Sequence, residues 1–272
     1  AWSIPTWWPA FGRRVPVAFS GTLAYGLLLD GNWQRRTVDR AGGRYATGVR
    51  YHEKAGYVRI GTDSSVVTLT AGAEMATQFG GTIHHYLGAS QPIHLPGGLR
   101  EAFYAFVAKG GSDPTDGDGY ANASGNTVGA WRFALTARSR REKMAARLYY
   151  DHFFEDESAA FDEYGWLDGL IGLELSLPLR SLHTVVAEFV RTDYQSGPVY
   201  HDHTPQLEEQ VSGIDNYYNH GLYPGWQHFG MAMGNALFAS PLYDHNGTLL
   251  FTANRFRAVH LGFSGAPPPR LT

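Results

Sequence analysis

A chain of 272 residues is long enough for one large domain, and all-β barrels of this size are commonly single units. Its formal net charge of −3 offers no basic surface to nucleic acid, so no nucleic-acid partner is expected. Cysteine is absent, which excludes disulfides and thiolate metal sites, and no run approaches 18 apolar residues, which excludes a transmembrane helix. The 33 glycines and the many Tyr, Phe and Trp residues favour strands and tight turns over helices.

The chain begins with an aromatic and basic segment. Its aromatic residues are Trp2, Trp7, Trp8 and Phe11, and they are followed by arginine at positions 13 and 14. This composition is typical of an aromatic belt with basic flanks at a membrane–water interface. Packing beneath a loop is the alternative.

Alternation of apolar and polar residues with a period of two is the dominant pattern after this segment, and it predicts strands. The clearest cases are residues 17–29, 67–75, 131–138 and 184–192. Further strands are expected at 44–60, 100–107, 143–153, 169–177 and 248–263, with long loops at 110–125 and 193–226. Helical periodicity is weak, and the whole chain, 1–272, is expected to form a single all-β domain.

Two geometries fit this alternation. In a small soluble sandwich the polar face of each strand meets water, whereas in a membrane barrel the polar face lines the interior and the apolar face meets lipid. The alternating runs approach the 9–11 residues that a tilted strand needs to cross a bilayer, which favours the barrel. The barrel places Leu69 and Phe133 in an outer belt with Leu23, and it places Thr22, Thr70 and Thr136 inside; the sandwich would bury Phe133.

Several local motifs occur in a fixed order in the second half of the chain. They are residues 149–158 (YYDHFFEDES), 168–170 (DGL), 188–192 (EFVRT), 195–198 (QSGP), 215–226 (DNYYNHGLYPGW), 234–238 (GNALF), 254–255 (NR) and 260–262 (HLG). In this order they resemble the Wzi-like capsule assembly family of outer-membrane β-barrels, with Ala236 where that family usually has proline. The resemblance is dense from about Tyr149 to Gly265 and weaker upstream.

This resemblance implies an antiparallel up-and-down transmembrane β-barrel in the outer membrane of a Gram-negative bacterium. It implies a non-enzymatic, monomeric, lectin-like protein without a cofactor or metal, whose partners are exported capsular polysaccharide and outer-membrane lipid. Family members are longer, so we expect the chain to be a fragment that lacks strands at both ends. The alternative function is a transport barrel of the porin type, which passes small solutes or sugars.

The segment 215–226 is the most specific match and the leading candidate for contact with sugar. Its aromatic rings offer apolar faces to pyranose C–H groups, and its amides and carboxylate bind hydroxyl groups. The alternative is that these rings plug the barrel interior or form an interfacial girdle. The predicted polysaccharide-binding residues are Asp215, Asn216, Tyr217, Tyr218, Asn219, Tyr223, Trp226, Glu188 and Arg191.

Glu188 places a charge on the polar face of an otherwise apolar strand. Inside a barrel it needs a partner, and Arg132, Arg147 or Arg191 is expected to provide an ion pair.

Two other sets of polar residues invite a function. The acidic run 155–157, paired with Glu188 or Glu208, suggests a glycoside hydrolase, but adjacent acids in a turn more often mark a solvated loop. The histidines at 84–85, and at 201 and 203 around Asp202, suggest a metal site, but they show no convergent third ligand.

Overall fold

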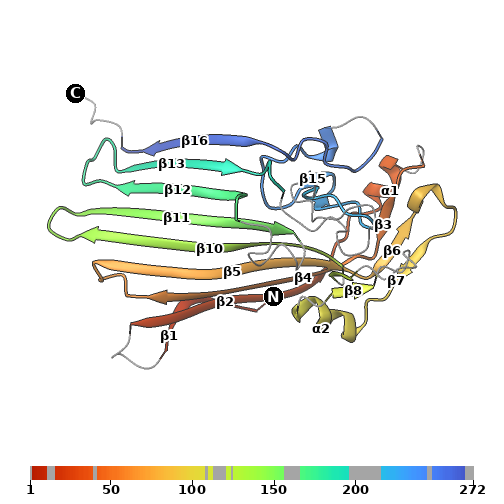
Figure 1. Cartoon of the computed structure of the whole chain (residues 1–272), viewed down its shortest axis with the longest axis horizontal. Helices are drawn as coiled ribbons and strands as arrows, with labels where there is room; N and C mark the ends of the chain where they lie inside the picture. Colours follow the sequence, from red (N-terminus) through yellow and green to blue (C-terminus); the bar gives the residue numbers. More distant parts are fainter. Residues whose placement is uncertain are drawn as a thin grey trace, which may run out of the picture.

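The computed structural model describes residues 2–10, 16–38, 42–107, 110–112, 121–123, 125–155, 166–195, 216–243 and 247–266 (Figure 1). These residues form an all-β structure around one nine-stranded sheet in which each strand runs antiparallel to its neighbours. The strands follow one another in the order β1 (Trp2–Ala10), β2 (Val17–Leu27), β4 (Arg50–Ile60), β5 (Val67–Phe79), β10 (Asn126–Ser139), β11 (Met144–Glu155), β12 (Gly169–Ser176), β13 (Thr184–Arg191) and β16 (Arg257–Ser264). The sheet is therefore up-and-down, with β1 and β16 at its edges.

The connections differ sharply between the two ends of the sheet (Figure 1). Turns of a few residues join β4 to β5, β10 to β11 and β12 to β13 at what we call the short-turn end. At the opposite, long-loop end, the connections carry the small elements. These are α1 (Trp33–Val38), β3 (Tyr45–Thr47), β6 (Gly81–His84), η3 (Tyr86–Gly88), β7 (Ile93–Leu95), α2 (Leu99–Val107), β8 (Gly110–Ser112), β9 (Ala121–Ala123), β14 (Gln227–His228), β15 (Met231–Ala232) and η4 (Pro241–Tyr243).

The strongly alternating segments form strands as predicted, whereas four other segments differ from the prediction. The expected loop at 110–125 contains the paired strands β8 and β9. The expected strand at 44–60 is two strands, β3 and β4, separated by Gly48 with a φ of 65°. Only the last part of 248–263 is a strand, β16. Residues 100–107 were predicted as a strand and this was wrong, because they form helix α2, whose first turn is closed by the Gly98 N–H donating to the Glu101 carboxylate at 2.8 Å. None of the helices in the described residues is long and apolar enough to cross a membrane.

One face of the sheet is apolar and exposed. Strand register aligns its side chains in rows across neighbouring strands; one such row consists of Phe19, Val58, Ala71, Phe133, Tyr150, Ile171, Phe189 and Val259. Leu69 and Leu135 belong to the next row, and both are more than two-fifths exposed. No second sheet covers this face in the described residues, so the sandwich geometry is excluded for them.

The opposite face is polar. Thr22, Thr70 and Thr136 lie on it, as the alternation predicts, together with most of the charged side chains of the strands. Trp7 and Trp8 of β1 lie on opposite faces: Trp8 pairs with Phe19 on the apolar face and is exposed, whereas the Trp7 ring lies 4.7 Å from the guanidinium of Arg59 on the polar face. Positions 11, 13 and 14, also predicted for an aromatic and basic belt, lie outside the described residues.

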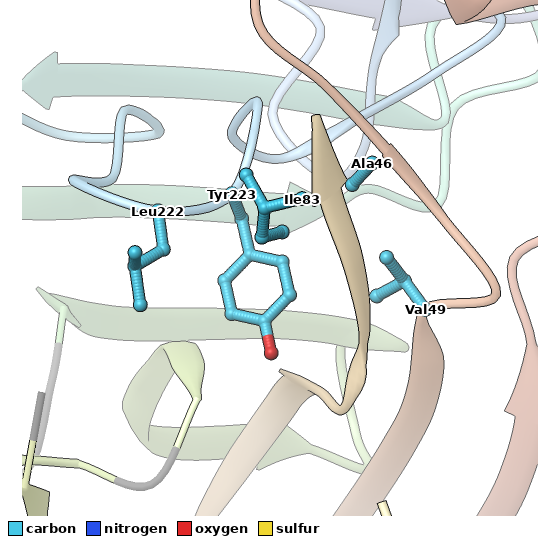
Figure 2. Close-up of a cluster of buried hydrophobic side chains, with 5 residues drawn as sticks. All are labelled: Ala46, Val49, Ile83, Leu222 and Tyr223. Carbon is cyan, nitrogen blue, oxygen red and sulfur yellow. The ribbon is translucent and has the colours of Figure 1, made fainter. Parts of the chain in front are cut away.

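The buried apolar core lies at the long-loop end rather than along the sheet. One cluster joins Ala46 and Val49 to Ile83 of β6 and to Leu222 and Tyr223, and Figure 2 shows the Tyr223 ring lying among the side chains of this group. A second, larger cluster contains aromatic residues of the same connection and packs on the polar face of the sheet: Tyr217, Tyr218, Trp226, Phe238 and Phe251.

Candidate functional site

Charged side chains on the polar face pair across neighbouring strands. Arg132 of β10 lies 3.0 Å from the Glu74 carboxylate of β5 and 3.5 Å from that of Asp151 on β11. Tyr57 of β4 donates its hydroxyl to Glu74, and Arg147 of β11 lies 3.7 Å from a carboxylate oxygen on β12. Direct cross-strand neighbours of opposite charge stabilise an antiparallel sheet. We call this set, with the groups around Glu188, the ionic ladder.

Glu188 lies on the polar face, as predicted, but its predicted partners were wrong. Its carboxylate accepts a hydrogen bond from the Tyr149 hydroxyl and lies 3.4 Å from Nδ1 of His260. Arg191 is three positions away on the same strand, so its side chain emerges on the opposite face. The two residues that were predicted to bind one polysaccharide therefore do not form one site.

Arg191 instead belongs to a charged group at the long-loop edge of the apolar face. Its Nε lies 2.6 Å from Asp193, whose carboxylate also lies 2.6 Å from Arg257. Burial opposes ionisation of Asp193, but the hydrogen bonds from Arg257 and Arg191 outweigh it and hold the pKa of Asp193 below its usual value.

Residues 216–238, which we call the plug segment, cover the polar face at the long-loop end. The indole Nε1 of Trp226 donates to Oδ1 of Asn126 at 3.1 Å, and the Gln78 amide donates to the Gly225 carbonyl at 3.2 Å. The backbone N–H of Tyr218 donates to the Glu155 carboxylate. Since Gln78, Asn126 and Glu155 lie at the strand ends of β5, β10 and β11, the plug segment is fixed to three strands at once.

A second group of buried polar contacts fixes the start of the plug segment. The Tyr217 hydroxyl donates to the Asp168 carboxylate at 3.1 Å, and Asn254 donates its amide to the Tyr217 carbonyl at 2.6 Å. Asn216 and Asn219 take part in the same network, with 2.9 Å between their side chains. Buried polar groups that are satisfied in this way specify one packing arrangement.

The four aromatic residues predicted to contact sugar are buried. Trp226 is 1% exposed, and Tyr217, Tyr218 and Tyr223 are also buried. Burial raises the pKa of Tyr218 to about 12, and it raises the pKa of Tyr223 as well. Contact between these rings and a sugar requires the plug segment to move, so their assignment to polysaccharide binding stays a prediction. Asp215, predicted for the same site, lies outside the described residues.

The structure places the other candidate residues in structural roles or outside its described part. Glu155 is buried and accepts the Tyr218 N–H, while positions 156, 157 and 208 lie outside the described residues, as do 201–203. His84 stacks on Tyr45 with 4.4 Å between ring centroids and lies 3.1 Å from the Thr47 hydroxyl. Within the described residues no three His, Asp or Glu side chains converge as a metal site.

Phe229 and Tyr243 are exposed in neighbouring turns at the long-loop end, and the sequence did not single them out. Phe229 is 44% exposed and Tyr243 is 69% exposed, and a hydrogen bond of 2.9 Å from Leu242 N to the Gly230 carbonyl joins their two turns. Phe229 has a φ of 52°, in the left-handed region that a bulky residue rarely adopts. A usable signal was present, since each ring lies in a turn rich in Gly, Ser or Pro.

Three kinds of polar or aromatic surface are thus available: the ionic ladder, the buried part of the plug segment that covers one end of it, and the exposed rings of Phe229, in the plug segment, and Tyr243. Ring faces and amide groups are suited to sugars, whereas paired carboxylates and arginines are suited to a hydrated interior. Comparison of the chain with models of known families, with curated proteins and with solved structures found no significant match.

Proposed function

We propose that this chain forms the wall of an outer-membrane β-barrel of capsule assembly and binds exported polysaccharide at its long-loop end. The observation that supports the barrel is the inverted distribution of side chains on one sheet. The face that carries Phe19, Ile171, Phe189 and Val259 is exposed, while the opposite face carries the ionic ladder. A contiguous apolar surface of this kind is unfavourable in water and favourable against acyl chains.

The border of the apolar face supports the same placement. At the long-loop end, Trp166 stacks on His152 with 4.7 Å between ring centroids and lies 5.8 Å from the Phe133 ring. Aromatic side chains of this kind favour the depth of lipid headgroups.

Helix α2 lies on the same border. The Tyr25 hydroxyl donates to the Ala102 carbonyl at 3.1 Å, and Lys54 donates to the Phe106 carbonyl. The outer side of α2 exposes apolar residues at helical spacing: Leu99, Phe103, Phe106 and Val107. A short helix with such a stripe is suited to lie flat in a membrane interface. In a bilayer the free edges of β1 and β16 have to be paired, by each other or by further strands.

The plug segment favours a binding protein over the porin-type alternative. It crosses the polar face at the end of β5, β10 and β11, and several of its side chains are buried there. A path for solutes along the polar face is therefore obstructed at the long-loop end. The polysaccharide role itself comes from the resemblance of residues 149–265 to the capsule assembly family.

For the sugar contact we propose Phe229 and Tyr243 in place of the buried rings. Both side chains are exposed at the long-loop surface, and Phe229 holds a φ in the left-handed region at a cost of about 1–2 kcal/mol. One pair of rings binds a pyranose weakly. Repeated contacts along one polymer add through effective concentration, which suits a protein that retains a long polysaccharide.

The barrel placement is tested by moving one charge between faces. Leu135 and Ala134 are adjacent on β10 and lie on the apolar and polar faces respectively. Leu135→Arg should reduce the fraction of protein that inserts into lipid vesicles, since arginine on a lipid face costs about 2–4 kcal/mol at the midplane, whereas Ala134→Arg should insert like the wild type. Equal insertion of the two variants would contradict the barrel.

The sugar contact is tested by retention of the chain on immobilised capsular polysaccharide. Phe229→Ala combined with Tyr243→Ala should reduce retention by about tenfold. Val66→Ala removes an exposed apolar side chain at the short-turn end and should leave retention unchanged. Unaltered retention of the double variant would reject these rings as the contact.

A further inference from the structure

A pocket of about 340 Å³ opens on the polar face near the short-turn end, far along the strands from the plug segment. Its lining includes Trp7, Arg59, Thr70, Arg138, Arg147 and Ser176, which come from β1, β4, β5, β10, β11 and β12. In a flat sheet β1 and β12 would lie roughly 29 Å apart, six steps of about 4.8 Å. Residues of both strands line one small pocket, so the sheet curls around its polar face.

The charges in this pocket do not cancel. Arg59 pairs with Asp63 at 3.0 Å, and Arg147 lies 3.7 Å from Glu174. Arg138 donates to the Thr68 hydroxyl at 2.8 Å, and within the described part of the chain it forms no ion pair. Three guanidinium groups therefore face two carboxylates, which leaves one positive charge.

Arg59 also holds an unused donor. Its Nε is buried and has no hydrogen-bond partner among the described residues, although its Nη1 donates to Asp63 and its guanidinium lies against the Trp7 ring. A buried donor without an acceptor costs free energy, which a bound acceptor recovers once the guanidinium shifts to present this nitrogen to the pocket. Thr70, Thr136 and Ser176 line the same pocket and add hydroxyl groups that both donate and accept.

We propose that this pocket binds a monoanionic, hydroxylated ligand of the uronic acid class. The carboxylate would take the free charge of Arg138, because a planar guanidinium matches a carboxylate through two parallel hydrogen bonds. The ring hydroxyls of the ligand would meet the Thr and Ser side chains. The single surplus charge favours a carboxylate over a phosphate dianion, and the pocket volume lies in the range of small-ligand sites.

This site goes beyond the proposed function, because it lies at the other end of the sheet from Phe229 and Tyr243 and does not depend on a polymer. Its test is accordingly separate. Isothermal titration of the detergent-solubilised chain would use D-glucuronate, D-glucose and inorganic phosphate as probes. Glucuronate should bind at least about tenfold more tightly than either of the others, since only it combines one negative charge with a pyranose ring.

Arg138→Gln removes the unpaired charge and should weaken glucuronate binding by about tenfold. Arg140→Gln is the matched control, because Arg140 is exposed in the adjoining turn and does not line the pocket. Thr136→Val, which changes shape little, should weaken glucuronate binding by a smaller factor and serves if Arg138→Gln does not fold. Glucose binding as tightly as glucuronate, phosphate displacing it at equal concentration, or an equal loss in the Arg140 variant would each overturn the proposal.

Discussion

Trp226 and Asn126 are 100 positions apart in the chain and are joined by a hydrogen bond of 3.1 Å from the indole Nε1 to Oδ1. Both side chains are fully buried, and the Asn126 amide also donates to Oε1 of Gln78 at 3.3 Å. The contact fixes the plug segment to the first residue of β10. Its strength depends on its surroundings, because a buried amide that loses its donor has no water to replace it.

Trp226→Phe should therefore destabilise the fold by about 1–3 kcal/mol, the cost of an unsatisfied buried acceptor together with lost packing. Denaturant unfolding of the detergent-solubilised chain measures this difference. Tyr243→Phe, at an exposed ring, is the control and should unfold at the wild-type denaturant concentration. Equal midpoints for the Trp226 variant and the wild type would show that the hydrogen bond contributes nothing.

Gly225 provides a second way to disturb the plug segment. Its φ is 90°, and a Cβ at this position would lie 2.2 Å from the Tyr218 carbonyl oxygen. Gly225→Ala should lower stability by about 2 kcal/mol or more, because strain and a backbone clash add. In planar bilayers the wild type should not conduct, whereas this variant should show intermittent ion conductance through the loosened plug.

The matched control is Gly221→Ala in the same segment, where a Cβ would meet no heavy atom within 4 Å. It should leave both stability and conductance unchanged. Conductance of the wild type would instead favour the solute-transport alternative.

The sheet was predictable from sequence because alternation of side chains follows directly from strand geometry. Residues 67–75 and 131–138 illustrate this, since one face of each reads as apolar and the other as Thr, Glu or Arg. The same rule separates Glu188 from Arg191, because residues an odd number of positions apart on a strand lie on opposite faces. The expected ion pair between Glu188 and Arg191 was wrong, although the spacing that excludes it could be read from the sequence.

Helix α2 and the burial of the plug segment were harder to predict from the sequence. In residues 100–107 the apolar residues suit a strand and a helix equally, and the decision rests on the Gly98–Glu101 contact and on packing against β4 and β5. The burial of Trp226 depends on Gln78 and Asn126, which are far away in the chain. Periodicity describes only local structure, so it could not show whether those rings face ligand or protein.

The placement of α2 in a membrane interface predicts a depth that can be measured. The chain has no cysteine, so single cysteines can be introduced and spin-labelled. A label at Phe103, on the exposed apolar stripe, should be relaxed more by oxygen than by a water-soluble nickel complex, because oxygen concentrates in lipid. A label at Glu142, exposed in the turn between β10 and β11, should show the reverse. The same preference at both positions would contradict an interfacial helix.

The lowered pKa of Asp193 makes one ion-pair group sensitive to acid. Because the folded-state value lies below the ordinary value of about 3.9, the contribution of Asp193 to stability is present above that pH and is lost as the pH falls through the lowered pKa. Protonation releases both Arg191 and Arg257 where β13 and β16 meet the long loops. The free energy of unfolding of the wild type should therefore fall between about pH 5 and pH 3 by more than that of Asp193→Asn, which lacks the titrating group.

Glu142→Gln removes an exposed carboxylate from the turn between β10 and β11 and should retain the wild-type pH dependence. Parallel curves for Asp193→Asn and the wild type would show that the two arginines do not stabilise the ionised carboxylate.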